Sequence, residues 1–462
     1  MTRIDRSISG GTLVTPYGRY AADIAIRDGK IVGIGEEGAF ASATEVVDAR
    51  SKLVIPGVID GHYHSMDPGR PDRETWATGT GAAAVGGVTT VLDMPLTSPP
   101  VVDAQTFGAK KRHASEGAIV DFGLHAGATA NNVERIRELW TETEATAVKM
   151  FMCFSVAEFP FVEDGDMAAI LRGLADVDAL AYLHCENNSM LSRLERSLKA
   201  AGRKDPMAHL ESHPAEAELE AINRALFLIE RSGAQAIIAH TTMPEGVHAV
   251  RGARSRGIRA WVESCPHYFR LTERDMVEKG PWVKFTPPMR DAASVARMWK
   301  LLDAGAIHSI GSDHNAYVKS EKQAGEDDIW LAPNGIPGVE TMLPMMLDGA
   351  NRGLVSVERL VETMAFNPAR LFGLFPKKGL IQPGSDADLV LVDMESERTI
   401  RSEDLVTKCG WSPYEGVSLK GWPVLTLVRG EVVARDGNLV GTPGYGEFVS
   451  RGKSASANRF AM

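Results

Sequence analysis

Residues 54–64 read VIPGVIDGHYH, an apolar run that ends in two histidines separated by a single residue. Side chains alternate along an extended strand, so His62 and His64 would point to the same side and could grip one metal ion together. Imidazole nitrogens are common ligands of zinc and similar ions. The stretch therefore predicts a strand that carries a pair of candidate metal ligands at its C-terminal end.

Further apolar runs follow this first one, and amphipathic helical patterns separate several of them. One such pattern places Leu219, Ile222, Leu226 and Ile229 on one helix face, which Gly233 can end. Eight strands that alternate with helices favour the α/β class, as a (β/α)8 TIM barrel rather than an open parallel sheet. The expected strands after the first are 88–95, 119–127, 146–153, 179–186, 234–242, 257–264 and 306–314.

Both ends of the chain have a different pattern, with short alternating runs around Asp28-Gly29 and Asp436-Gly437, which is typical of β-hairpins. We expect one small β-sandwich domain formed by both termini rather than two separate hairpins, because chain ends often lie close together. The expected division is 1–53 and 376–445 for the β-sandwich, 54–375 for the catalytic barrel and 446–462 for a loose or partner-docking C-terminal tail.

Composition narrows the class of protein. The chain has 462 residues, of which 44% are hydrophobic and 24% are charged, and these are ordinary globular values. The formal net charge of −10 argues against binding to nucleic acid or to an anionic membrane. The four cysteines lack CxxC spacing, and neither a secretory signal nor an 18-residue apolar run is present, so we expect a cytoplasmic protein.

Candidate functional side chains fall at the C-terminal ends of the expected strands, the face on which barrel enzymes keep their active sites. Nitrogen and carboxylate ligands converging there suit Zn²⁺ and similar first-row ions. The candidate metal ligands are His62, His64, Lys149, His184, His240 and Asp313.

Lys149 is unusual because it lies between apolar residues in AVKMF, where an unpaired charge is costly. It could extend its ammonium group to the surface, or it could lose its proton and react with CO₂. The resulting carbamate would bridge two cations, and we favour it because the sequence offers few other carboxylates for that bridge. Asp313 could ligate a metal and move a proton, or it could cap the following segment.

Several longer motifs carry a family resemblance over nearly the whole chain. They include GGVTTVLDMPLTSPP, LHCEN, ESCPHYF, TPPMRD, APNGIPGVET and GSDADLVLVD. With VIPGVIDGHYH, these motifs resemble the cyclic-amidase branch of the amidohydrolase superfamily, which contains hydantoinases, allantoinases, dihydropyrimidinases and dihydroorotases. The resemblance implies two divalent metals, with zinc expected and manganese or cobalt as alternatives, and a carboxylated lysine at Lys149. All of the family's metal ligands match the candidates named above.

The resemblance also implies an activity, the hydrolytic opening of a C–N bond in a cyclic amide or ureide. Asp313 would take a proton from the attacking nucleophile and pass it to the leaving ring nitrogen. The substrate would be a hydantoin-like ring, opened by a hydantoinase or allantoinase type of enzyme, with a dihydropyrimidinase or another cyclic imide hydrolase as the alternative. Members of this branch are usually homotetramers and sometimes homodimers.

Individual positions separate the possible substrates. Met66 and Leu96 stand where dihydroorotases carry Arg and Asn for the substrate carboxylate, which argues against that activity. Phe154 stands where D-selective hydantoinases and dihydropyrimidinases usually carry an oxyanion-binding Tyr. The segments ESCPHYF and DMPLT are similar to allantoinases, whereas APNGIPGVET is similar to hydantoinases, especially L-selective ones.

Three further residues are candidate substrate contacts. Thr286 and Asn334 could each bind the substrate through the backbone, with ordinary loop residues as the alternative, and His267 is a candidate pocket residue. Two other classes of function fit the sequence less well. A catalytically inactive scaffold would have lost metal ligands, whereas the full set is present, and a mononuclear deaminase would not need Lys149.

Overall fold

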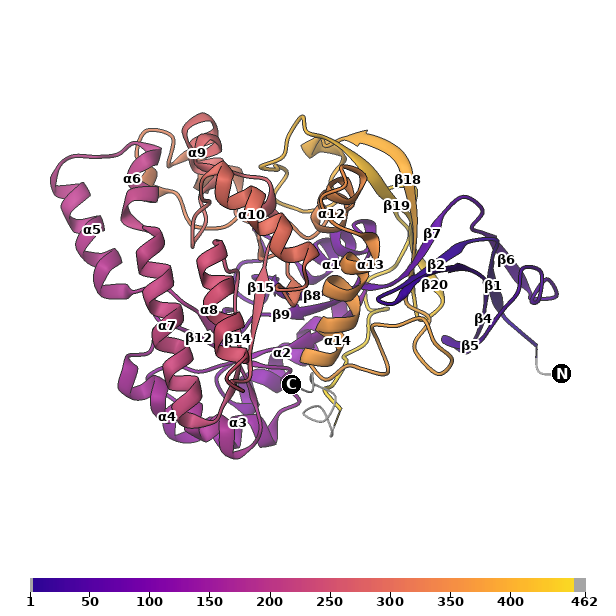
Figure 1. The fold of residues 1–462 in the computed structure, drawn as a ribbon, viewed down its shortest axis with the longest axis horizontal. Coiled ribbons are helices and arrows are strands. Elements are labelled where there is room, and N and C mark those ends of the chain that lie inside the picture. Colours follow the sequence, from indigo (N-terminus) through magenta and orange to yellow (C-terminus); the bar gives the residue numbers. More distant parts are fainter. Residues whose placement is uncertain (1–2, 453–462) are drawn as a thin grey trace.

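The computed structural model describes residues 3–452, which form an α/β protein with a barrel and an adjoining β-sandwich (Figure 1). The barrel helices occupy one side of the view. The N-terminal strands lie at the other side, next to the C-terminal strands β18 (Leu389–Thr399) and β19 (Ser418–Val428). This arrangement confirms the expected fold class.

The barrel is built from short parallel strands, and each run expected from the sequence contributes at least one. Their pairing orders are β17-β8-β9-β10 and β11-β12-β13-β14-β15-β16. Because β10 leads directly into β11 and β16 into β17, the two arcs join into one ring. The strands are β8 (Val58–His64), β9 (Val88–Asp93), β10 (Asp121–Leu124), β11 (Ala126–Gly127), β12 (Val148–Phe151), β13 (Leu180–His184), β14 (Gln235–Ile238), β15 (Ala260–Ser264), β16 (Ser309–Ile310) and β17 (His314–Asn315).

Helices alternate with these strands and cover the outside of the barrel (Figure 1). In α7, the expected apolar face is buried at Ile222, Leu226 and Ile229, while Leu219 is partly exposed. Gly233 ends this helix with a left-handed φ of 73°. The helices are α1 (Trp76–Val85), α2 (Ala104–Gly117), α3 (Ile136–Glu142), α4 (Asp164–Asp176), α5 (Asn188–Ala200), α6 (Pro206–Ser212), α7 (Ala215–Ser232), α8 (Pro244–Arg254), α9 (Glu273–Lys279), α10 (Ala292–Asp303), α11 (Lys319–Gln323), α12 (Met342–Asn351), α13 (Val357–Val361) and α14 (Asn367–Leu371).

The β-sandwich combines strands from both ends of the chain. One sheet has the order β21-β20-β19-β18-β7-β2-β3, and the other has the order β5-β4-β1-β6. A shared apolar core includes Ile24, Leu13 and Leu389. Both expected hairpins are confirmed, β4-β5 around Asp28-Gly29 and β20-β21 around Asp436-Gly437. The strands not yet given are β1 (Arg6–Ser9), β2 (Thr12–Thr15), β3 (Gly18–Ala21), β4 (Asp23–Arg27), β5 (Lys30–Gly35), β6 (Glu45–Asp48), β7 (Leu53–Pro56), β20 (Glu431–Arg435) and β21 (Asn438–Leu439).

The first expected barrel strand, 54–62, is in fact divided between the two parts of the protein. Residues Leu53–Pro56 form β7, which pairs with β18 and β2 in the sandwich, and the barrel strand β8 starts only at Val58. The intervening Gly57 lies against Thr89, where an added Cβ would come within 2.1 Å of the hydroxyl oxygen. Both halves of the run are apolar because both are buried, so the sequence pattern could not separate them.

A buried cluster of ion pairs joins barrel strand β10 to the segment that leads into sandwich strand β18. The ammonium group of Lys378 lies 2.6 Å from Asp388 and 2.9 Å from Asp386, and it also contacts Asp121 at the start of β10. Arg429 makes a second ion pair with Asp121. Each buried charge therefore has an opposite charge beside it, as burial of ions requires.

The expected C-terminal tail begins as an ordered segment rather than a loose one. The Val449 amide donates a 2.7 Å hydrogen bond to Phe122 in β10, and Arg451 donates to three backbone carbonyls around residues 140–145. Residues 446–452 thus pack against the end of the barrel at which the strands begin. The remainder of that tail, 453–462, lies outside the described residues.

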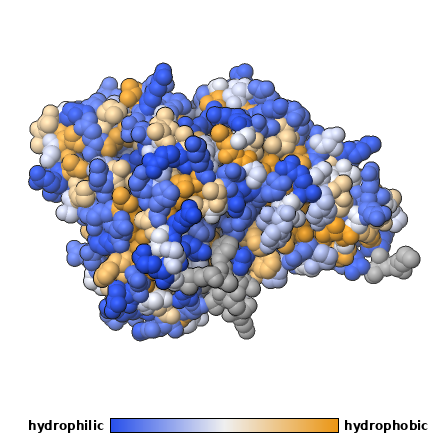
Figure 2. All heavy atoms as spheres, viewed as in Figure 1, coloured by the Kyte–Doolittle hydropathy of each residue, from blue (hydrophilic) through white to orange (hydrophobic). Residues whose placement is uncertain are grey.

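The surface visible in Figure 2 is mostly hydrophilic, with apolar residues in small groups. Within residues 3–452, no helix combines the length and the hydropathy needed to cross a lipid bilayer. All four cysteines are buried and none is in a disulfide.

Candidate metal centre

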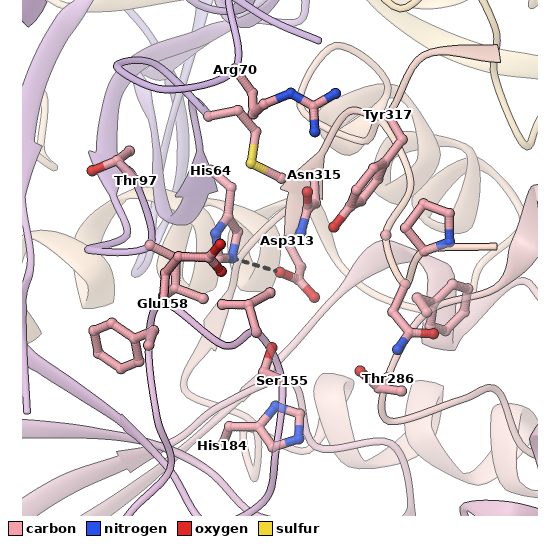
Figure 3. A pocket seen from close by; sticks show the side chains of 18 of the residues that line it. His64, Arg70, Thr97, Ser155, Glu158, His184, Thr286, Asp313, Asn315 and Tyr317 are labelled. Atoms are coloured by element: carbon pink, nitrogen blue, oxygen red, sulfur yellow. Dashed lines mark ion pairs between the residues drawn. The ribbon is translucent and has the colours of Figure 1, made fainter. Parts of the chain in front are cut away.

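A pocket of about 520 Å³ opens at the C-terminal ends of the barrel strands (Figure 3). All six candidate ligands contribute to its lining: His62, His64, Lys149, His184, His240 and Asp313. Strands β8, β12 and β13 carry the first four of them, and the other two follow β14 and β16. Residues far apart in the sequence therefore meet because the barrel closes into a ring.

His62, His64 and Asp313 form one tight group of donors. A carboxylate oxygen of Asp313 lies 3.2 Å from Nε2 of His62 and 3.3 Å from Nε2 of His64. Burial raises the pKa of Asp313, but the two facing histidines more than offset it and hold the carboxyl below its usual range. Burial lowers the pKa of His62 well below the ordinary value, so its ring is neutral at neutral pH and free to ligate a cation.

His184 and His240 form the neighbouring pair. Nδ1 of His184 lies 3.0 Å from Nε2 of His240, and the ring of His240 lies 5.3 Å from that of His62. Burial lowers the pKa of His240 well below its ordinary value, which leaves this ring neutral as well. The two groups of ligands are therefore adjacent.

Lys149 lies in β12, fully buried and without a hydrogen-bond partner for its ammonium nitrogen among the described residues. Its Nζ lies 4.9 Å from the Tyr182 ring and 5.0 Å from the Phe151 ring. Burial lowers the pKa of Lys149 to about 8. The side chain lines the pocket instead of extending to the surface, and a larger fraction of its amine is neutral than at the ordinary pKa of 10.5.

Buried partners hold these ligands in place. Nδ1 of His62 is 2.7 Å from the Glu263 carboxylate, which also accepts a hydrogen bond from the Tyr182 hydroxyl. Asp60 accepts hydrogen bonds from the amide and the hydroxyl of Ser312, next to Asp313. Burial raises the pKa of Glu263 to about 8 and that of Asp60 to about 7.

The backbone at two ligands adopts a conformation that is rare for residues other than glycine. The φ angle is 33° at His240 and 47° at Asp313. Such strain collects at functional sites, where the surrounding fold imposes it. It places both side chains beside those from β8.

The donor set fits divalent metal ions. The donor atoms of His62, His64 and Asp313 all lie within 4.8 Å of one another, and Nδ1 of His240 has no hydrogen-bond partner in the described structure. A second group of Cys153, His184 and Glu186 also clusters, but burial raises the pKa of the Cys153 thiol well above its usual value and keeps it a poor ligand. The histidine nitrogens, the ionised aspartate and the unpartnered lysine nitrogen are therefore the matching set.

The other residues singled out from the sequence divide into two groups. Met66, Thr286 and Asn334 line the pocket. Phe154 is absent from its lining and its side chain is 62% exposed. His267 is buried and packs 4.4 Å from the ring of Phe285, a lining residue, without lining the pocket itself.

Sequence reasoning missed several residues of the site. Glu263 and Tyr182 are polar side chains within otherwise apolar strands, and that interruption is a signal that could have identified them. The other pocket residues carried no such signal, because they lie in loops or, for Asn315, in the two-residue strand β17, and such short or irregular segments show no period. They are Arg70, Arg73, Thr97, Ser155, Glu158, Asn315 and Tyr317, and most are labelled in Figure 3.

Comparison with known proteins gives consistent matches along the chain. The model of the amidohydrolase family matches residues 53–433. An L-hydantoinase from Paenarthrobacter aurescens is 39% identical over 95% of this chain and 96% of its own length. An allantoinase from Rubrobacter xylanophilus is 38% identical over 97% of this chain and 98% of its own. The solved structure of an L-hydantoinase (dihydropyrimidinase) from Arthrobacter aurescens matches with a TM-score of 0.95 and 38% identity, covering 97% of this chain and all of that one.

Proposed function

The chain belongs to the amidohydrolase family, and from this premise we propose that it hydrolyses a C–N bond of a hydantoin-like cyclic amide. One observation carries the proposal. Four histidines, one aspartate and one buried lysine, from five separate strands or strand ends, all line a single pocket. An inactive scaffold would have no need to keep these groups together, and a mononuclear enzyme would not need the lysine.

We propose that these residues hold two divalent cations, most simply zinc, with Lys149 carboxylated by CO₂ as the bridging ligand. His62 and His64 would serve one cation, His184 and His240 the other, and Asp313 would complete the set. Bound there, the cations would polarise the ring carbonyl and make a water molecule a stronger nucleophile. The unpartnered Nζ of Lys149 supports the carbamate, because a free buried amine would otherwise lose a hydrogen bond.

Asp313 would move protons in this reaction. It is the most exposed of the six, and its carboxyl stays ionised beside His62 and His64. It can therefore accept a proton from the attacking water and return it to the leaving ring nitrogen. Glu263 supports this arrangement by fixing the ring of His62, which limits the motion of the histidine facing Asp313.

The pocket wall favours a hydantoin with a substituent at C5. Met66, Leu96, Phe151 and Phe159 give the wall an apolar character suited to such a side chain. Allantoin is the second candidate, because the hydroxyl groups of Thr97 and Ser155 could bind its ureido group and because an allantoinase is 38% identical.

The test compares opening of 5-benzylhydantoin and allantoin by zinc-loaded protein, with a chelator-treated sample as the control. Opening of the hydantoin at the higher kcat/KM supports the proposal. Preference for allantoin selects the second candidate. Failure to open either ring with two ions bound per chain would refute the proposed reaction.

The resemblance to the cyclic-amidase branch also supports a homotetramer or homodimer, which light scattering would measure. A location in the cytoplasm agrees with four buried cysteines that form no disulfide.

A further inference from the structure

We propose that Glu158 makes this pocket selective for cyclic amides whose exocyclic side chain ends in a cation, such as an alkylammonium group. The inference rests on the proposed ring-opening function and deepens it by naming a substrate class. Outside the metal-ligand set, the charged side chains on the pocket wall are Arg70, Arg73 and Glu158.

Glu158 belongs to the loop between β12 and α4, and its carboxylate points into the pocket (Figure 3). The next residue, Phe159, is only 1% exposed, and its ring packs 5.8 Å from that of Phe151. The Val162 amide donates a 2.9 Å hydrogen bond to the Phe151 carbonyl, which closes the loop. The buried Phe159 therefore anchors the segment that presents Glu158 to the pocket.

The two arginines on the wall already have partners. Arg73 donates to Glu321 at 2.6 Å and stacks 4.2 Å above the Tyr317 ring. Arg70 pairs with Asp72 at 2.7 Å and with Glu321 at 3.0 Å. By contrast, no hydrogen bond or ion pair holds the Glu158 carboxylate within residues 3–452. Apart from the candidate metal ligands, the unpaired charge on this wall is therefore negative.

The wall also offers a path for the stem of such a side chain. Leu96, Val156 and Phe159 are apolar lining residues, and two of them belong to the same loop as Glu158. Methylene groups can contact these side chains while a terminal ammonium group pairs with the carboxylate. Because Glu158 is exposed, solvent and salt screen the pair, and a preference of about 1.5- to 5-fold is expected.

The experiment uses three rings that differ only in the end of the side chain. The zinc-loaded protein is given 5-(4-aminobutyl)hydantoin, its neutral counterpart 5-pentylhydantoin, and 5-(3-carboxypropyl)hydantoin. In Glu158→Gln, the ratio of kcat/KM for the aminobutyl ring to that for the pentyl ring should fall about 1.5- to 5-fold. Glu163→Gln is the matched control, since Glu163 is exposed on the same segment but does not line the pocket, and it should leave the ratio unchanged.

An unchanged ratio in Glu158→Gln would overturn the inference, as would a preference of the wild type for the carboxypropyl ring. Calorimetry measures binding of the aminobutyl and pentyl rings, and it therefore tests the inference independently of the proposed reaction. If no ring opens but aminobutyl binding still depends on Glu158, the charge selectivity stands and the reaction is refuted. If the rings open and neither binding nor rate depends on Glu158, the reaction stands and the inference is refuted.

Discussion

Replacing Lys149 with alanine should abolish the two-metal site while leaving the barrel folded. The side chain is fully buried in β12 and points into the pocket beside the histidines. Alanine cannot form a carbamate, so the proposed bridge between the cations would be lost. We expect one bound ion or fewer per chain, and a fall in kcat/KM of about 10²- to 10³-fold because the ring carbonyl loses part of its polarisation.

The lowered pKa of Lys149 determines how much burial increases the fraction of neutral amine. With a pKa of about 8, about one-tenth of the amine is neutral at pH 7. At the ordinary value of 10.5 the neutral fraction would be about 0.03%, so burial raises the CO₂-reactive fraction about 300-fold. Carboxylation is therefore expected at neutral pH for this lysine and not for surface lysines.

Metal content by atomic emission and ring-opening rates on 5-benzylhydantoin measure the two expected losses. Lys149→Arg serves as a second variant, because it keeps a long cationic side chain that cannot be carboxylated, and circular dichroism checks the fold of both. Two ions per chain and a rate within about threefold of wild type in Lys149→Ala would refute the carbamate reasoning.

Four other expectations follow from the structure. Asp313→Asn should lower kcat by about 10²- to 10⁴-fold with metal content unchanged or reduced, because proton transfer is lost; a kcat near wild type would contradict that role. Glu263→Gln should weaken zinc affinity about 10- to 100-fold by loosening His62, as measured by competition with a chelator. Phe154→Tyr should leave kcat/KM within about twofold, because this side chain is exposed and does not line the pocket. Burial raises the pKa of Glu340 to about 8. Between about pH 4.5 and pH 8 the folded protein therefore keeps a proton that the unfolded chain releases, and the free energy of unfolding should fall as the pH rises through this range. Denaturant midpoints at pH 5 and pH 8 should differ less in Glu340→Gln than in wild type, and an equal difference would contradict the assignment.

The barrel and the grouping of the candidate metal ligands could be predicted from the sequence because both follow from local patterns. Alternation within a strand puts His62 and His64 on one side, and the ends of parallel strands share one face. Lys149 was identifiable because a cation within an apolar strand is unusual. None of these inferences required the conformation of a loop.

The remaining features depend on contacts between distant parts of the chain. Strand β7 differs from β8 only in its pairing partner, so Leu53–Pro56 could not be distinguished from the barrel run that follows. The bond between Tyr182 and Glu263 joins β13 to β15, which are not neighbours in the sheet. In the loop after β12, Phe159 rather than Phe154 turns inward, and spacing from Lys149 does not determine that choice.

The most direct test is a zinc titration of metal-free protein, followed by the rate at which 5-benzylhydantoin opens. The rate should rise to a plateau at two ions per chain, because both groups of ligands are needed to polarise the ring and supply the nucleophile. A plateau at one ion, or two bound ions with no ring opened, would contradict a binuclear cyclic amidase.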